Sequence, residues 1–134
     1  MGAKTVEYTL KLNSQQANYL LKAVELLMRL KINQPKEISR DVLDGMYNRL
    51  GIDEYLRRKN LANEYLEKAF AVIFPSYDEV QKDEEWHVLY NIYQAVRYQR
   101  HLAEFPNSKG VDSYPPMDLS GHGIPECTWE SKEG

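Results

Sequence analysis

The pattern of apolar and polar positions changes near the start of the chain from a period of two to a helical period. In residues 5–12 apolar and polar side chains alternate, which is typical of a half-buried β-strand. After a capping residue at Asn13 or Ser14, apolar residues recur every three or four positions as far as Lys31, which predicts a helix. Because a single strand is not stable alone, we expect residues 5–12 to pair with a second strand.

Two more helices are predicted in the middle of the chain. Pro35 suits the first position of the second helix, and Gly51 suits its C-terminal stop. Asp53 can cap a third helix, which we expect to bend near residues 59–60 and to end at Pro75. Both segments carry an apolar stripe at helical spacing, so we expect them to pack on the rest of the protein.

The last third of the chain predicts a long helix followed by two short strands. Residues 76–79 read as a capping box that opens a fourth helix over about 78–104. Residues 117–120 and 124–129 flank a Gly-His-Gly turn and predict a hairpin or two strands. The expected fold class is therefore α+β, with about four helices packed on a small antiparallel sheet formed by the N-terminal strand and the C-terminal strands.

Composition narrows the class of protein. At 134 residues the chain, 1–134, is expected to be a single domain. Its net charge of −3 argues against a general DNA or RNA binder, which needs a basic surface. Cys127 is the one cysteine, and no apolar run approaches a membrane span, so we expect a cytoplasmic protein without a membrane partner. The sequence has no motif for a nucleophile, a phosphate loop or a metal site, so neither catalysis nor a cofactor is expected.

The fourth predicted helix carries the candidate ligand-binding residues. Tyr90, Tyr93 and Arg97 are three or four residues apart and should share one face. Aromatic rings stack on bases, Arg97 and Arg100 offer paired donors to phosphate, and the carboxamide of Asn91 suits the edge of a heterocycle. The same residues also suit a simple helix core or a protein–protein interface, where Tyr and Arg are common anchors.

Two further cations are candidates for phosphate contacts. Arg29 lies at the end of the predicted first helix, where a cation is also favoured by the helix dipole. Lys109 lies beside Gly110 in a predicted loop, where a solvated lysine is equally expected. The sequence leaves both alternatives open.

The order of these features resembles that of a family of small phage proteins, the Thoeris anti-defence sponges of the first type. The likeness covers the layout of most of the chain except residues 45–80. The matching segments are a strand leading into a helix start, the rest of that helix, the following turn, the last helix and a closing strand, at residues 8–17, 20–30, 34–38, 89–97 and 113–120.

The resemblance implies a protein that binds a cyclic ADP-ribose isomer made by TIR-domain enzymes of bacterial immunity and keeps it intact. It further implies a homo-oligomer, a dimer that assembles into hexamers, acting in the cytoplasm of an infected bacterial host. Asn91 matches a ligand-contacting asparagine of the family, and Arg29 matches a basic residue ending its first long helix. Lys109 lies where the family has an arginine that helps to hold cyclic oligonucleotides, and lysine lacks the paired donors of arginine. The alternative function is a protein–protein interaction module that inhibits a host factor.

Overall fold

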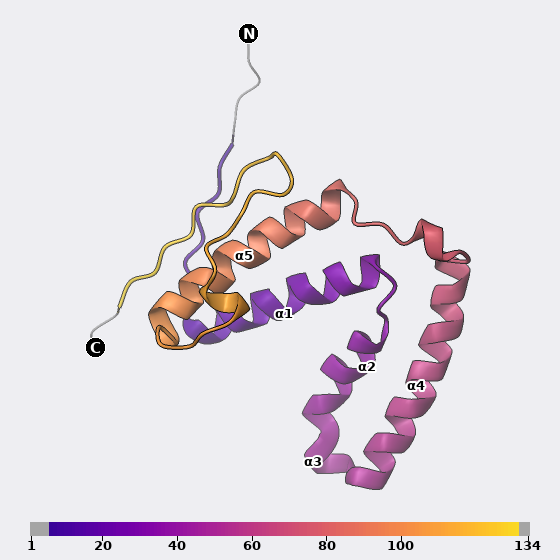
Figure 1. Cartoon of the computed structure of the whole chain (residues 1–134). Coiled ribbons are helices and arrows are strands. Elements are labelled where there is room, and N and C mark those ends of the chain that lie inside the picture. Colours follow the sequence, from indigo (N-terminus) through magenta and orange to yellow (C-terminus); the bar gives the residue numbers. More distant parts are fainter. Residues whose placement is uncertain (1–5, 132–134) are drawn as a thin grey trace.

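The computed structural model describes residues 6–131 and consists of helices joined by irregular segments (Figure 1). The five α-helices are α1 (Ser14–Lys31), α2 (Lys36–Leu43), α3 (Tyr47–Leu50), α4 (Ile52–Ile73) and α5 (Glu84–Glu104). Three short 3₁₀ turns accompany them, η1 (Asp44–Met46), η2 (Tyr77–Glu79) and η3 (Val111–Ser113).

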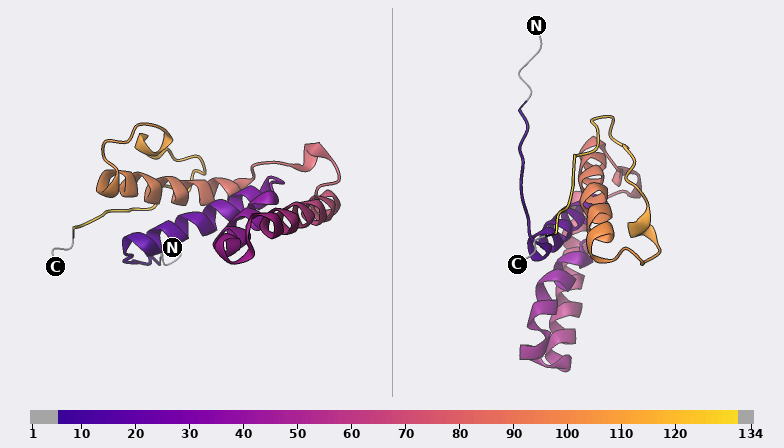
Figure 2. Two further views of the ribbon diagram at one scale, coloured as in Figure 1. Left: turned by 90° about the horizontal axis from the view of Figure 1, so that it is seen from below. Right: turned by 90° about the vertical axis from the view of Figure 1, so that its left-hand side faces the viewer.

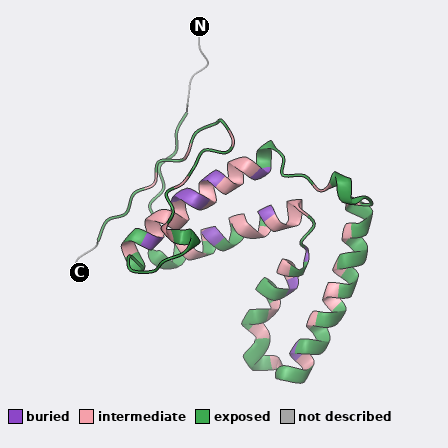
Figure 3. Ribbon diagram, viewed as in Figure 1, coloured by how far each residue is buried: buried purple, intermediate pink, exposed green. Residues whose placement is uncertain are grey.

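Helices α1 and α5 form the antiparallel pair at the centre of the structure (Figures 1 and 2). The predicted start of α1 is confirmed, because Asn13 and Gln16 form a reciprocal capping box. Leu21 and Met28 of α1 and Trp86 of α5 are buried. Figure 3 shows that several further positions along α5 are buried as well. The core of the protein is therefore small and lies between these two helices.

Helices α2, α3 and α4 form an arm that extends from one end of the α1–α5 pair (Figure 1). Gly51, with φ of 75°, makes the reversal into α4 and confirms the predicted stop. Ser39 of α2 contacts Asn63 of α4 through their side chains, and the hydroxyl of Tyr55 donates to Asp44 at 2.5 Å. The arm thus relies on a few polar contacts between its helices in addition to apolar packing, and much of its surface is exposed (Figure 3).

The prediction of a sheet, and with it the α+β fold class, is wrong: the part of the chain between residues 6 and 131 contains no strand. Residues 6–12 are extended, but Tyr8 is 92% exposed, and residue 5 of the predicted strand lies outside the described residues. One ion pair, Lys11 to Glu130 at 3.7 Å, joins this segment to the C-terminal one. Alternation specifies which side of a strand is apolar, but it does not supply the partner whose backbone completes a ladder.

Three predicted helices also differ from the structure in their extent or continuity. The predicted second helix is interrupted by η1, and α4 continues through residues 59–60 as one helix. Ser76 caps only η2, and the last helix begins at Glu84, where the carboxylate of Asp83 accepts from the backbone N–H of Trp86 at 2.8 Å. The predicted capping box of residues 76–79 does not form, because Ser76 accepts only from the N–H of Asp78 at 3.3 Å and the chain is extended again at Val80.

Candidate functional site

The buried face of α5 holds the C-terminal segment through two carboxamides. Asn91 is 1% exposed, and its Nδ2 donates to Asp118, Ser120 and the carbonyl of Gly123 at 2.7, 2.9 and 3.2 Å. Its Oδ1 accepts from the backbone N–H of Leu119 at 3.1 Å. A ligand could use this carboxamide only after displacing the segment, so the predicted role of Asn91 as a ligand contact requires a rearrangement.

One turn further along α5, Gln94 makes a matched pair of hydrogen bonds with the backbone of Met117. The amide nitrogen of Gln94 donates to the Met117 carbonyl at 2.9 Å, and its oxygen accepts from the Met117 N–H at 3.0 Å. The carboxylate of Asp118 in turn accepts from the backbone N–H groups of Gly121 and Gly123. The hydrogen bond from Asn91, followed by these backbone donors, holds the pKa of Asp118 below its usual value.

Cationic and anionic side chains from four elements line a small cavity that we call the basic pocket. It has a volume of about 230 Å³ and lies between α1, α2, α5 and η3. Its charged lining consists of four cations and three carboxylates, a local balance of +1 in a chain of net charge −3. The full lining is Asn18, Leu21, Lys22, Glu25, Arg40, Asp41, Tyr93, Arg97, Arg100 and Asp112.

Arg97 and Arg100 bring the cationic side of this pocket from successive turns of α5. The side chain of Arg97 is 13% exposed, and its guanidinium lies 5.1 Å from the centre of the Tyr93 ring. The Nε atoms of both arginines are buried and make no hydrogen bond to any described residue. Each lies only at ion-pair distance from a carboxylate, 3.6 Å from Asp112 for Arg97 and 3.4 Å from Glu104 for Arg100. Neither buried Nε donor therefore has a hydrogen-bond acceptor among the described residues.

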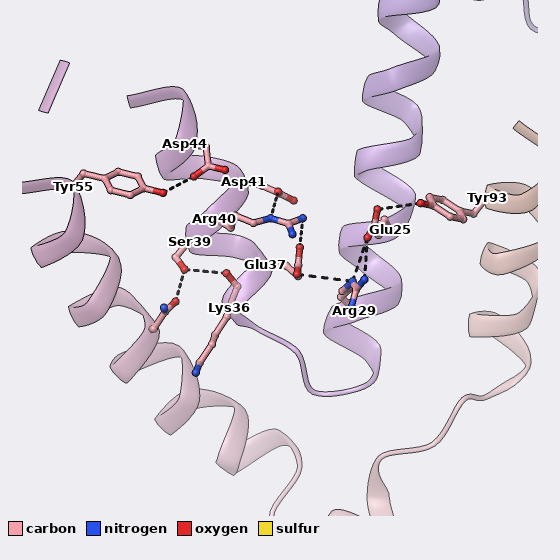
Figure 4. A network of polar contacts seen from close by, with 11 residues as sticks. Glu25, Arg29, Lys36, Glu37, Ser39, Arg40, Asp41, Asp44, Tyr55 and Tyr93 are labelled. Carbon is pink, nitrogen blue, oxygen red and sulfur yellow. Dashed lines mark hydrogen bonds and ion pairs between the residues drawn. The ribbon is translucent and has the colours of Figure 1, made fainter. Parts of the chain in front are cut away.

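Glu25 of the pocket links Tyr93 to Arg29, which lies outside the pocket lining (Figure 4). The Tyr93 hydroxyl donates to Glu25 at 3.3 Å, and burial together with this carboxylate raises the pKa of Tyr93. Arg29 donates to Glu25 and, at 2.8 Å, to Gln34 in the turn after α1. Its guanidinium also lies 3.9 Å from the carboxylate of Glu37. Arg29 is thus engaged in holding α1 to α2.

Of the six predicted ligand-binding residues, the basic pocket brings together Tyr93 and Arg97. Tyr90 lies outside it, stacked between Trp86 and Tyr93 with ring centres 5.1 and 6.5 Å apart. Asn91 faces the C-terminal segment, Arg29 lines a separate open groove of about 570 Å³, and Lys109 is exposed in the loop after α5.

Sequence reasoning missed the contributions of Arg40 and Asp112 to the pocket. Arg40 lies in α2, far in sequence from Arg97, and Asp112 lies beyond the end of α5, so helical periodicity links neither of them to Arg97. Sequence reasoning also missed the anchoring role of Gln94. The available signal was that a polar carboxamide occupies a buried position of α5, where it needs hydrogen-bond partners.

Comparisons with protein-family models, curated proteins and solved structures give no match for the chain. Among the helices between residues 6 and 131, none combines the length and the apolar character needed to cross a membrane. The same residues contain no cluster of three or more histidine, cysteine or acidic side chains able to hold a metal ion. The geometry of the basic pocket and the resemblance of the sequence are therefore the two grounds for a functional assignment.

Proposed function

We propose that the protein binds a cyclic nucleotide immune signal, a cyclic ADP-ribose isomer, and sequesters it without cleaving it. The observation that carries the proposal is the convergence of Arg40, Arg97 and Arg100 on one cavity. The buried Nε atoms of Arg97 and Arg100 have no hydrogen-bond partner within residues 6–131. A diphosphate offers several anionic oxygens, and arginine pairs with such groups through parallel hydrogen bonds. The likeness of the sequence to the anti-defence sponges supports the same ligand class.

The size of the pocket limits which part of such a ligand it accepts. Its volume of about 230 Å³ is below the range of roughly 300–1,000 Å³ typical of pockets for whole small molecules. It suits the diphosphate, and the Tyr93 ring on its wall offers an apolar face to the adjoining sugar or base. We therefore propose that a second copy of the chain encloses the remainder of the ligand, in keeping with the dimer that the resemblance implies.

A thermal-shift and release assay tests this function directly. The panel consists of cyclic ADP-ribose isomers together with cyclic di- and trinucleotides, because some members of the family that the sequence resembles also hold cyclic oligonucleotides. A true ligand at a hundred times its Kd stabilises the folded protein by about 2.7 kcal/mol, which raises Tm by roughly 10 °C for a chain of this length. Heating the complex should then release the ligand unaltered.

Matched arginine variants localise the binding. Loss of a charge-assisted hydrogen bond costs about 1.5–3 kcal/mol, so Arg97→Ala should weaken binding roughly ten- to a hundredfold. Arg57→Ala is the control, because Arg57 is an exposed arginine of α4 that pairs with Glu54. Equal affinity of Arg97→Ala and wild type would show that the ligand binds elsewhere, and a cleaved ligand after heating would show an enzyme.

The alternative function, inhibition of a host factor by direct contact, is favoured by a different observation. Helix α4 exposes large apolar side chains on the arm, among them Leu61, Tyr65 and Val72, which are 41%, 62% and 82% exposed. Apolar side chains of this size at one surface are typical of protein interfaces. This function predicts no thermal shift with any nucleotide of the panel and loss of host-factor binding in Tyr65→Ser.

A further inference from the structure

The loop that follows α5 contributes one carboxylate to the basic pocket. Asp112 lies in η3, and its Oδ1 is 3.6 Å from Nε of Arg97, too far for a hydrogen bond. The Asp112 side chain is 60% exposed, whereas that of Arg97 is 13% exposed. The pair therefore joins a buried cation to a solvated anion across a loose contact.

The other two carboxylates of the pocket are held by side chains on helices. Glu25 accepts from Arg29 and Tyr93, and Asp41 accepts from its neighbour Arg40 at 3.3 Å. Asp112 has no such partner among the described residues apart from Arg97. Glu25 and Asp41 lie in α-helices, whereas Asp112 lies in the loop that contains η3. Moving Asp112 away from the pocket therefore disrupts less structure than moving either of the other two carboxylates.

The loop is fixed at its two ends and weakly in between. At its start the N–H of Ser108 donates to Phe105, and at its end Met117 is held by Gln94. Between these points the hydrogen bonds of η3 are internal, joining Gly110 and Ser113. Among the described residues, the ion pair with Arg97 is thus the charged contact between η3 and α5.

We propose that Asp112 is a built-in competitor, a carboxylate that occupies the anion position beside Arg97 in the free protein and is displaced by the phosphate of a bound ligand. The proposal rests on the proposed function, since it concerns the same pocket. A phosphate oxygen can form hydrogen bonds with a guanidinium that Asp112 does not form, and a dianion carries more charge than one carboxylate. Anions with a single charge would then fail to displace Asp112, so Asp112 would make the pocket specific for phosphates.

Titration calorimetry with inorganic pyrophosphate, at low ionic strength and neutral pH, measures the effect of the competitor. In wild type, pyrophosphate must first break the ion pair between Asp112 and Arg97, and an exposed ion pair of this kind is weak. Asp112→Asn, which lacks the pair, should therefore bind pyrophosphate about three- to fivefold more tightly than wild type. Asp78→Asn is the matched control, because Asp78 is an exposed acid of η2 and its loss changes the net charge by the same amount. It should bind as wild type does.

Hydrogen exchange of η3 distinguishes displacement from closure of the loop over the ligand. The N–H groups of Ser113 and Tyr114 form the backbone hydrogen bonds of η3, to Gly110 and Val111. Displacement predicts that pyrophosphate makes these amides exchange about fivefold faster, and that Asp112→Asn exchanges faster even without pyrophosphate.

The outcomes separate this inference from the proposed function. Tighter binding by Asp112→Asn, with faster exchange of η3, supports the competitor. Equal or weaker binding by Asp112→Asn, or slower exchange of η3 on binding, overturns the competitor while leaving the anion site in place. No binding of pyrophosphate by either protein overturns both the competitor and the anion site.

Discussion

The substitution Asn91→Ala tests how the C-terminal segment is attached to α5. The side chain of Asn91 is almost completely buried and forms hydrogen bonds to four groups between residues 118 and 123. Alanine removes both the donor and the acceptor and leaves the neighbouring Gln94 contact in place. The variant therefore isolates one of the two anchors of the segment.

The expected loss of stability follows from the neutral groups that lose a partner. These are the Leu119 N–H, the Gly123 carbonyl and the Ser120 hydroxyl. A hydrogen bond of this kind contributes about 1 kcal/mol, so the free energy of unfolding should fall by about 3 kcal/mol. For a chain of 134 residues this lowers Tm by roughly 10 °C.

Urea and thermal unfolding followed by circular dichroism measure this loss. Asn60→Ala is the control, because Asn60 is exposed within α4 and alanine is a good helix former. It should unfold at or slightly above the wild-type temperature. A loss below about 1 kcal/mol in Asn91→Ala would refute the reasoning, because it would mean that water replaces these hydrogen bonds without penalty.

Two further predictions concern the arm. The paired arginines after Glu54 lower its pKa from 4.5 to about 2, so its contribution to stability is present above pH 4.5 and is lost as the pH falls toward 2. Tm measured over that range should fall less steeply in Glu54→Gln than in wild type, and an unchanged slope would contradict the pKa. Gly51→Ala forces on alanine a backbone with φ of 75° and ψ of 163°, a region essentially restricted to glycine, and should cost about 1–3 kcal/mol. Gly45→Ala, with equal free space around it and no positive φ, should cost less. Denaturant midpoints compare the two, and an equal loss in both would remove the backbone explanation.

Local signals in the sequence predicted the features that neighbouring residues determine. The capping box at Asn13 and the glycine at residue 51 both act within a few positions, and both predicted boundaries are found in the structure. The start of α5 was predicted too early because two caps compete there. The sequence alone does not say that Asp83, and not Ser76, begins the long helix.

Features that depend on distant partners were predicted poorly. The alternation in residues 6–12 is clear, but pairing needs a second strand, and the segment near residue 120 gives its hydrogen bonds to Asn91 and Gln94 instead. The basic pocket likewise joins Arg40 and Arg97, although the whole of α4 lies between them in the chain. Their proximity depends on the packing of both α2 and α5 against α1. Residue type predicted which side chains suit an anion, and tertiary structure determined which of them meet.

The pairing of α1 with α5 has a consequence for the order of synthesis. Helix α1 ends at Lys31, whereas its partner begins at Glu84 and ends at Glu104. At about 5–20 residues per second, α1 emerges from the ribosome several seconds before α5 is complete, while the arm can form from contacts that are close in sequence. During that interval the apolar face around Leu21 and Met28 has no helix to cover it. A nascent chain halted before residue 84 should therefore engage a chaperone through α1, and one that includes all of α5 should not.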